Sequence, residues 1–469
     1  MDLAGIGFEL KKLYGEEKGV LRTVGAMGYS AAATIGPTIL VVAALITVNL
    51  LMSIWGVSED EKMTFAGCIL YCFITALIVS SIFDTVISRY VSDCVFSDKI
   101  EKVLPAVQGS TMLMAVILGV IGAALSAALY FVAGLDLYYV VMVYLTLLGV
   151  GLTFSLSVFA TAVKSYRRIS FCYLIGVCVL VTVTVVCRLL FKMPIGKSLI
   201  TGFALGFQSI SLHLYFYLHI AFPKGDRSYF DFFEGLRKNK LLLVSGLFYV
   251  LGLYVHNMVF WAGSELHVAV RKILFCAPSY DMASFLAMLT GLSSMVIFVV
   301  RTETSFYPEY KGYCEAVIGN NLNRVNFTRE RMIRTLINEV YFVGEFQIII
   351  TLVVMVLAMT FLPLIGIAGI ALDIYPILAL GYYAVFMMHI LMILLYYFDD
   401  QKGAALVGIS FFVMSLVFTV ITRLLGVKFY GLGLVLAAVI TWIMAFWRLR
   451  KTLGSVDYIM FCDNVKVRM

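Results

Sequence analysis

Charged residues are scarce in this sequence. Asp, Glu, Lys and Arg make up 13% of the 469 residues, whereas about 25% is usual in a soluble domain. Hydrophobic residues account for 62%, and the mean hydropathy is +0.98. This composition excludes a soluble enzyme, a disordered chain and a fibrous repeat. A transmembrane barrel is disfavoured because its strands alternate over about 10 residues, whereas apolar runs here last roughly 20 or more. We expect an all-α polytopic membrane protein.

Recognisable metal, disulfide and catalytic patterns are also lacking. The nine cysteines are an odd number and imply no disulfide framework. Cys68 and Cys72 lie four apart and could form a metal pair, although small buried residues are the more usual role. Gly196-Lys197-Ser198 fails as a phosphate loop because Phe191 occupies the required glycine position. Asp399 and Asp400 are read as a solvated turn. We expect no enzyme activity, no cofactor and no metal site, and transport becomes the default function.

Twelve apolar windows are long enough to cross a hydrocarbon core of about 30 Å. Their approximate ranges are 27–55, 63–92, 104–132, 137–163, 168–191, 198–222, 241–262, 280–302, 341–363, 374–398, 403–425 and 430–448.

The distribution of Lys and Arg predicts the orientation. If the N-terminus is inside, 25 of the 35 basic residues fall in inner segments, six fall in outer loops and four lie at span ends. This excess follows the positive-inside rule. We therefore expect a multi-pass membrane protein with both termini in the cytoplasm.

The spans suggest five segments and two equal sets of helices. Residues 1–26 form an amphipathic cytoplasmic segment without a signal-peptide core. Residues 27–222 form a first six-helix bundle and residues 241–448 a second one, joined by the linker 223–240. Residues 449–469 form a cytoplasmic tail. Two such bundles would face each other across a central cavity.

Several polar side chains fall deep inside the predicted spans, where an ionisable group costs roughly 2.5–3.5 kcal/mol. Taken singly, each is more often a helix–helix hydrogen bond than a ligand. Taken together with the abundant aromatic residues, they fit a cavity that binds carbohydrate, although a drug cavity would look similar. The candidates for the transport path are His256, Asn257, Trp261, Gln208, His213, Ser155, Ser157 and His389.

Two further sets of residues are candidates for movement and for charge pairing. Gly36 and Pro37 fall about ten residues into the first span, where proline kinks a helix, so this bend is either a gate or a passive kink. Arg89 and Asp93 lie four apart and can pair on one helix face. The predicted charge network at the inner face comprises Asp84, Arg89, Asp93, Arg301 and Glu303.

The segment 301–340 is unusually polar for this chain. We expect one or two surface helices with a turn at Gly319-Asn320-Asn321. One interpretation is a connector solvated at the lipid headgroups. The other is a docking platform for a cytoplasmic partner, with Arg324, Arg329, Arg331 and Arg334 as the contact residues.

Five sequence segments resemble a known family. They are GIGFELKKL at the start, GYSAAATIGPTILV in the first span, SRYVSDCVFSDKIEKVLPA after the second, HNMVFW in the seventh and RTETSFYPEYKGYCEAVIGN after the eighth. They are similar to PelG, the membrane transporter family of bacterial Pel exopolysaccharide systems, within the superfamily of multidrug, oligosaccharidyl-lipid and polysaccharide exporters. The resemblance implies twelve spans in two bundles and no assigned residue roles.

The resemblance also implies a function and partners. It implies export of an N-acetylhexosamine-rich polymer made by a cytoplasmic PelF-like glycosyltransferase, with PelD-like and PelE-like membrane subunits. Without an ATP site, polymer elongation or an ion gradient would supply the energy, and His256 is the candidate if protons take part. The alternatives are a drug or lipid-linked oligosaccharide antiporter and a scaffold that conducts nothing.

Overall fold

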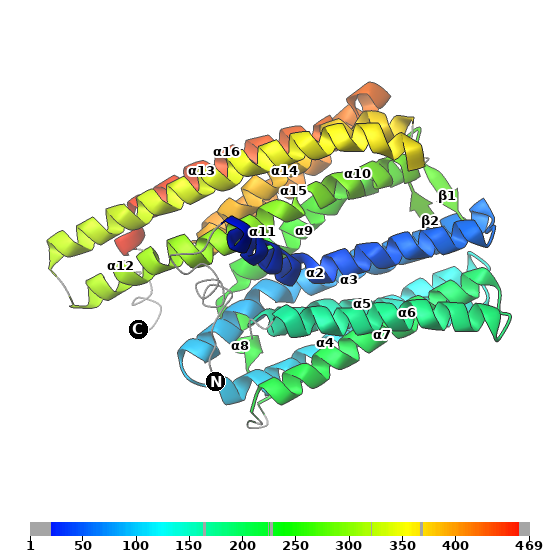
Figure 1. The fold of residues 1–469 in the computed structure, drawn as a ribbon, viewed down its shortest axis with the longest axis horizontal. Coiled ribbons are helices and arrows are strands. Elements are labelled where there is room, and N and C mark those ends of the chain that lie inside the picture. Colours follow the sequence, from blue (N-terminus) through cyan, green and yellow to red (C-terminus); the bar gives the residue numbers. More distant parts are fainter. Residues whose placement is uncertain are drawn as a thin grey trace.

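The structure is a computed structural model that describes residues 20–162, 166–223, 225, 228–319, 321–365 and 369–458, with side chains from residue 36 onward except at residues 96, 162, 166, 167 and 365. Most of the predicted amphipathic segment 1–26 and the end of the predicted tail lie outside the described residues. The described part of the chain is almost entirely helical, as expected, and the helices run side by side along the long axis of the molecule (Figure 1).

Twelve spanning helices are present in the described residues, which confirms the predicted number. Helix formation follows from long charge-free runs, because only a helix satisfies its own backbone hydrogen bonds in lipid. The spans of the first half are α2 (Val20–Ile54), α3 (Glu59–Phe96), α4 (Val103–Phe131), α5 (Leu137–Ala162), α6 (Tyr166–Leu189) and α7 (Ile195–Ala221).

The second half follows a short helix, α8 (Phe232–Lys238). Its spans are α9 (Lys240–Trp261), the composite eighth span, α13 (Leu322–Phe361), α14 (Ile370–Tyr397), α15 (Gln401–Leu425) and α16 (Leu432–Gly454). The eighth span joins α10 (Pro278–Thr290), α11 (Leu292–Arg301), a π-helical turn (Thr302–Phe306) and α12 (Tyr307–Gly319). It breaks at Gly291, where a side chain would collide with the ring of Phe386.

Buried apolar side chains form two clusters. One is built mainly from α2 to α8, and the other mainly from α9 to α16. Ile74 of α3 belongs to the second cluster, so α3 is shared between them. The two clusters are the physical basis of two packed halves, whereas the domain boundaries given above stay a prediction.

A small β-hairpin was not expected from the sequence, which predicted only an outer loop there. The strands β1 (Val268–Val270) and β2 (Leu274–Cys276) pair antiparallel, with Ala269 opposite Phe275. Arg271 and Lys272 form the turn with positive φ. The hairpin lies against α3, as the side chain of Leu274 beside Gly67 shows. We call this side of the molecule the strand end.

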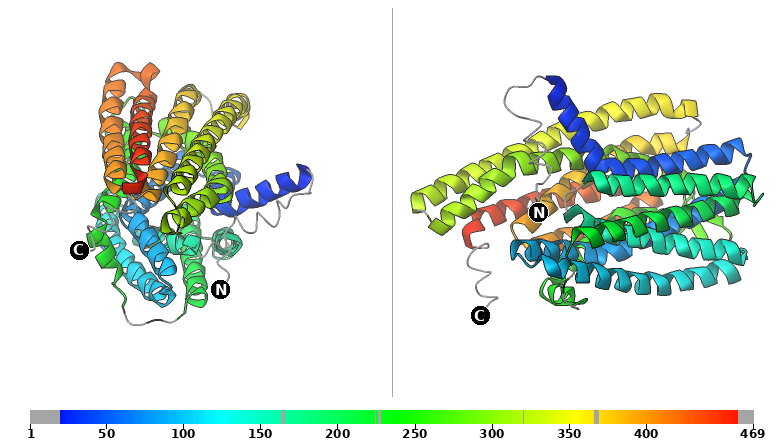
Figure 2. Two further views of the ribbon diagram at one scale, coloured as in Figure 1. Left: turned by 90° about the vertical axis from the view of Figure 1, so that its left-hand side faces the viewer. Right: turned by 60° about the horizontal axis from the view of Figure 1, so that its bottom comes forward.

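The opposite side carries the largest departure from expectation, and we call it the hairpin end. Segment 301–340 does not form separate surface helices. Instead, α12 and the first half of α13 continue the eighth and ninth spans and project as an antiparallel pair (Figures 1 and 2). They stay helical because apolar side chains such as Tyr313, Met332 and Leu336 are buried between them. The turn falls near the predicted place, since Asn321 caps α13 by accepting a hydrogen bond from the Arg324 amide.

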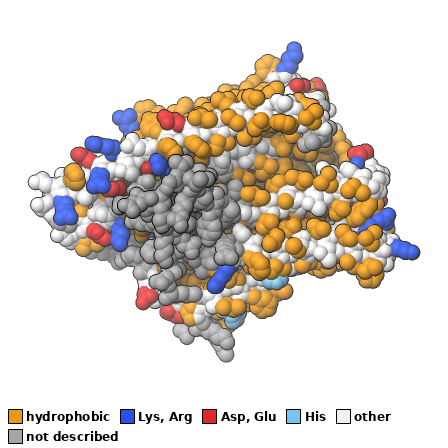
Figure 3. Space-filling view, viewed as in Figure 1, with side chains coloured by type: hydrophobic (Ala, Val, Ile, Leu, Met, Phe, Trp, Pro, Cys, Tyr) orange, Lys and Arg blue, Asp and Glu red, His pale blue; other side chains and the backbone are white. Residues whose placement is uncertain are grey.

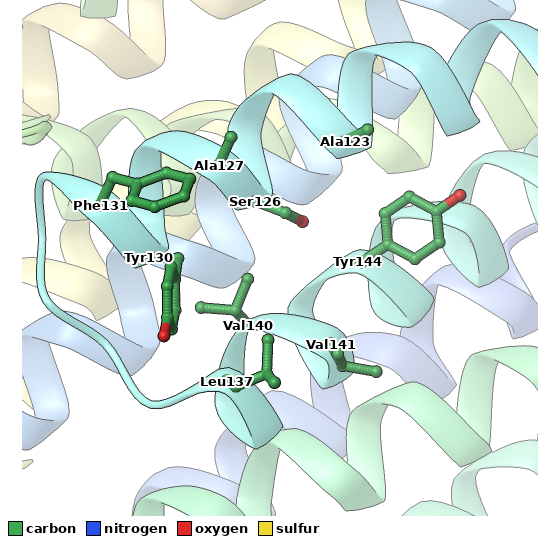
Figure 4. Close-up of a pocket in the computed structure, with 9 residues that line it drawn as sticks. All are labelled: Ala123, Ser126, Ala127, Tyr130, Phe131, Leu137, Val140, Val141 and Tyr144. Carbon is green, nitrogen blue, oxygen red and sulfur yellow. The ribbon is translucent and has the colours of Figure 1, made fainter.

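The flank between the two ends is apolar. Hydrophobic side chains cover it, and charged side chains gather mainly toward the ends (Figure 3). A hollow of about 370 Å³ between α4 and α5 is lined by exposed groups such as Phe131 and Leu137 (Figure 4). Because it lacks converging polar groups, we treat it as lipid-facing surface. A second hollow of about 360 Å³ lies on α13, so neither hollow lies between the two clusters.

Candidate functional site

The polar centre nearest the strand end is the carboxylate of Asp281, near the start of α10. It accepts hydrogen bonds from Asn257 Nδ2 at 2.7 Å, from Trp261 Nε1 at 2.9 Å and from the amide of Ala277 at 2.9 Å. Three N–H donors stabilise a negative charge that would otherwise be costly in a span. The indole of Trp261 also stacks on Tyr71 of α3, with ring centroids 5.5 Å apart and planes at 16°. This carboxylate therefore orients an aromatic contact between the two halves.

His256 occupies the next level and is fully buried. Its Nδ1 lies 2.9 Å from the hydroxyl of Tyr280, and its Nε2 lies 3.4 Å from the hydroxyl of Tyr382. Tyr382 also bonds Ser284 at 2.9 Å, and Ser284 donates to Asn257 Oδ1 at 3.4 Å. The polar groups of three helices are thus linked into one hydrogen-bonded group.

Two contacts continue this arrangement toward the hairpin end. The ring of His389 stacks on Tyr249 with centroids 4.3 Å apart and planes at 12°. Ser245 bonds the hydroxyl of Tyr396 at 2.9 Å. Ser245 and Trp261 are 16 residues apart on one helix, or about 24 Å at 1.5 Å per residue, which is most of the hydrocarbon thickness. We call this set the polar–aromatic ladder; it comprises Ser245, Tyr249, His256, Asn257 and Trp261 of α9, Tyr280, Asp281 and Ser284 of α10, and Tyr382, His389 and Tyr396 of α14.

The predicted transport-path residues fall into two groups. His256, Asn257, Trp261 and His389 meet in the ladder. The others lie in the first half: Gln208 donates to the Leu145 carbonyl at 3.0 Å and His213 contacts the Ser209 carbonyl at 2.7 Å. Ser157 bonds the Tyr173 hydroxyl at 2.9 Å, and the buried Ser155 hydroxyl has no partner within the described residues. The structure thus does not bring all eight together, and their roles stay predictions.

The ladder contains residues that sequence reasoning missed. Asp281 follows Pro278 by three positions at the start of a span, and a carboxylate so close to an apolar run was the available signal. The tyrosines at positions 249, 280, 382 and 396 carry no such signal, because Tyr is abundant throughout the chain.

The predicted charge network separates into three parts. Arg89 pairs with Asp399 at 3.0 Å and more loosely with Asp93 at 3.5 Å. Arg301 of α11 pairs with Glu339 of α13 at 2.5 Å. The carboxylate of Asp84 accepts from the Ser80 hydroxyl at 2.8 Å, one turn away on α3. These groups are therefore not one network, although the Arg89–Asp399 pair does connect the two halves at the hairpin end.

The turn at Asp399–Asp400 is not simply solvated, so that interpretation was wrong. Asp400 is 6% exposed and holds Arg448 in two contacts, at 2.6 and 2.7 Å. Burial raises the pKa of Asp400, but hydrogen bonds from Arg448, Thr452 and the Gly403 amide outweigh it and hold the pKa below its usual range. The reason is tertiary, since α16 supplies the arginine.

A matching contact joins the halves at the strand end. Arg271, in the turn between β1 and β2, pairs with Asp60 of α3 at 2.6 Å. The hydroxyl of Tyr71 accepts from the Phe275 amide at 3.1 Å and lies 3.0 Å from its carbonyl. Polar contacts therefore connect the two halves at both ends of the molecule in this conformation.

The remaining predicted residues are the gating candidates and the docking arginines. Gly36 and Pro37 lie inside the continuous helix α2, and a side chain at Gly36 would meet Ser170 of α6. Among the docking arginines, Arg329 pairs with Asp457 at 2.5 Å and Arg331 with Glu309 at 2.8 Å. Arg324 and Arg334 are exposed. No group of three or more His, Cys, Asp or Glu that could hold a metal ion occurs among the described residues.

Solved structures identify the fold. An outward-facing multidrug resistance MATE family transporter of the MOP superfamily is 13% identical, with a TM-score of 0.63 over 96% of this chain and 98% of that chain. A MOP superfamily transporter from Pyrococcus furiosus is 14% identical, with a TM-score of 0.63 over 96% and 98%. An inward-facing MATE transporter is 13% identical, with a TM-score of 0.57 over 85% and 92%.

At such low identity these structures show only that the chain has the fold of this transporter superfamily. No curated protein matches the sequence. The sequence profile of the PelG family, described as "Putative exopolysaccharide Exporter (EPS-E)", matches residues 3–461. The match covers both halves, the ladder and the projecting hairpin, so this multi-pass membrane protein belongs to the PelG family of exopolysaccharide exporters.

Proposed function

We propose that this chain exports an N-acetylhexosamine-rich, Pel-like exopolysaccharide across the bacterial plasma membrane. A cytoplasmic PelF-like glycosyltransferase makes the polymer, and PelD-like and PelE-like subunits accompany it in the membrane. The hairpin end and both termini face the cytoplasm. Family membership and the excess of basic residues at the hairpin end support this proposal.

The single observation that carries the proposal is the polar–aromatic ladder. A sugar ring presents hydroxyl groups that need hydrogen-bond partners and C–H faces that pack on aromatic rings. The ladder supplies both chemistries over about 24 Å of α9. A row of this length suits successive units of a polymer better than one small molecule.

Most of the ladder is closed to solvent in the structure. Tyr280 and His256 are fully buried and Tyr382 is 2% exposed. The contacts of these side chains lie among α9, α10 and α14 of the second half, so access requires these three helices to rearrange. Separation of the halves would accompany this change and break the Arg89–Asp399 contact at one end or the Arg271–Asp60 contact at the other. Domain movement of this kind is the usual basis of alternating access.

The test uses sealed inverted vesicles that contain the exporter with its synthase. Polymer inside the vesicles is protected from an added glycoside hydrolase, and total polymer measures synthesis. Tyr382→Phe removes the hydroxyl that contacts both His256 and Ser284 but keeps the ring. We expect protected polymer to fall several-fold while synthesis continues.

Tyr138→Phe is the matched control, because it removes a hydroxyl that bonds Thr201 at 2.8 Å, outside the ladder and away from the predicted path residues. Equal export by both variants would contradict a path along the ladder. Polymer made but never protected, even by the natural sequence, would favour the scaffold instead.

A second candidate function, export of small molecules or lipid-linked oligosaccharides by antiport, is favoured by the multidrug MATE transporters that share the fold. Liposomes that contain only this chain distinguish the two. Movement of small organic cations that is driven by an imposed proton gradient, without any synthase, would support the antiporter.

A further inference from the structure

The projecting half of α13 is too long to be covered by lipid. The helix has 40 residues and is about 60 Å long, twice the thickness of the hydrocarbon core. From Phe346 onward it carries no charged residue, so this part occupies the membrane. Residues 322–345 extend about 36 Å from the start of this charge-free part.

This projection is held firmly in place. Arg329 of α13 pairs with Asp457 after α16, and the hydroxyl of Tyr313 on α12 also donates to Asp457. Near the membrane, Arg301 pairs with Glu339 at 2.5 Å, and its guanidinium lies 4.2 Å from the centre of the Phe342 ring. A braced pair of helices presents a fixed surface rather than a flexible connector.

One stripe of the projecting half of α13 is exposed. Phe327 is 65% exposed, Tyr341 60% and Ile337 42%, and a hollow of about 360 Å³ is formed around Ile333, Arg334 and Ile337. We call this surface the α13 face; it consists of Arg324, Phe327, Arg331, Arg334, Ile337 and Tyr341. Arginine and aromatic residues around apolar side chains are the composition of protein interfaces.

The position and charge of the α13 face narrow down what covers it. Phe327 precedes the charge-free segment by 19 residues, or about 28 Å, which is beyond the reach of lipid tails. Arg324 and Arg334 face outward with the carboxylate of Glu330 beside them, whereas Arg331 is paired with Glu309 of α12. The face therefore keeps a net positive charge, so two copies of it would repel each other. No ion pair within the described residues engages Arg324 or Arg334, and their charges are available to a partner of opposite sign.

We propose that the α13 face docks a cytoplasmic protein through a surface on which carboxylates surround apolar residues. The proposal rests on the orientation given under the proposed function, which places the hairpin end in the cytoplasm. It extends that function by assigning the synthesis machinery a fixed place about 30 Å from the membrane on the cytoplasmic side.

Photo-crosslinking in cells with the full-length chain tests the docking. A photoreactive phenylalanine analogue replaces Phe327, and the same analogue at Val353, 53% exposed in the charge-free part of the same helix, is the control. We expect position 327 to give one adduct with a cytoplasmic protein and position 353 to give none.

Charge reversal tests whether formation of the adduct depends on the arginines of the α13 face. Arg324→Glu with Arg334→Glu should lower the yield at position 327 at least five-fold. Lys311→Glu with Lys451→Glu, which reverses two exposed cations at the same end but off the α13 face, should leave it unchanged. Replacing carboxylates by lysine at the crosslinked site of the partner should restore the yield.

Other outcomes overturn the proposal. An adduct of twice the mass of this chain would mean self-association, and an adduct with lipid only would mean a membrane-lying hairpin. A yield that is unaffected by Arg324→Glu with Arg334→Glu would remove the charge argument. Polymer export is measured in the same cells, so export without an adduct refutes docking alone, and an adduct without export refutes the proposed function alone.

Discussion

The hydrogen bond between Asp281 and Trp261 offers the sharpest test of the ladder. Asp281→Ala removes an acceptor that serves three N–H donors, and each buried donor left unsatisfied costs about 1–3 kcal/mol. Because Asp281 is only half-buried, water offsets part of this loss. We expect the variant to lose about 2–4 kcal/mol of unfolding free energy.

A double-mutant cycle isolates the Trp261 contact. Trp261→Phe keeps a ring against Tyr71 but removes the N–H group that lies 2.9 and 3.0 Å from the two carboxylate oxygens. A hydrogen bond to a charged group contributes about 1.5–3 kcal/mol, so Asp281→Ala and Trp261→Phe should couple by that amount. Unfolding is followed in lipid nanodiscs, with each variant also scored for protected polymer.

Two results would refute this reasoning. The first is additivity of the two changes within about 0.5 kcal/mol, which is the scatter expected of independent sites. The second is equal destabilisation by Asp136→Asn, a control at an exposed turn where the carboxylate pairs with Lys197. Full export by a stable Asp281→Ala variant would keep the structural role and remove the transport role.

Three further predictions concern contacts between helices. Arg89→Asp should reduce the amount of protected polymer several-fold, because Arg89 and Asp399 join the two halves. Adding Asp399→Arg in the same chain should restore it. If the exchanged pair does not restore export, the link between the halves is contradicted. The pKa of Asp400 lies below 3.8, so its pairing with Arg448 stabilises the protein above about pH 4 and the contribution is lost as pH falls through the folded pKa. Asp400→Asn should therefore make the melting temperature fall less as the pH is lowered below about 4. An unchanged fall would argue against a stabilising role for the Asp400–Arg448 pair. Gly246→Leu should weaken packing and export, because even a Cβ there lies 2.8 Å from the Ser81 carbonyl of α3; a stable, fully active variant would show that α3 and α9 separate easily.

The sequence by itself determined the class of protein and the number of crossings. Long charge-free runs leave the backbone no polar partner in lipid other than itself, so helices follow directly from composition. Buried histidine and asparagine in α9 were also visible, because polar residues inside an apolar run are rare enough to notice.

Only the tertiary structure decided which polar groups meet. Asp281 and Trp261 are 20 residues apart in the chain, and Arg89 and Asp399 are 310 apart, so no local pattern could pair them. Gln208 and His213 looked equivalent to His256 in sequence, but they bond carbonyl groups in the first half whereas His256 bonds Tyr280 and Tyr382 in the second. Which neighbours a polar side chain meets depends on helix rotation and packing rather than on hydropathy. The same holds for the projecting hairpin: its polar composition predicted one or two surface helices, and contacts of α13 with α12 and with Asp457 after α16 hold α12 and α13 as a continuous projecting pair instead.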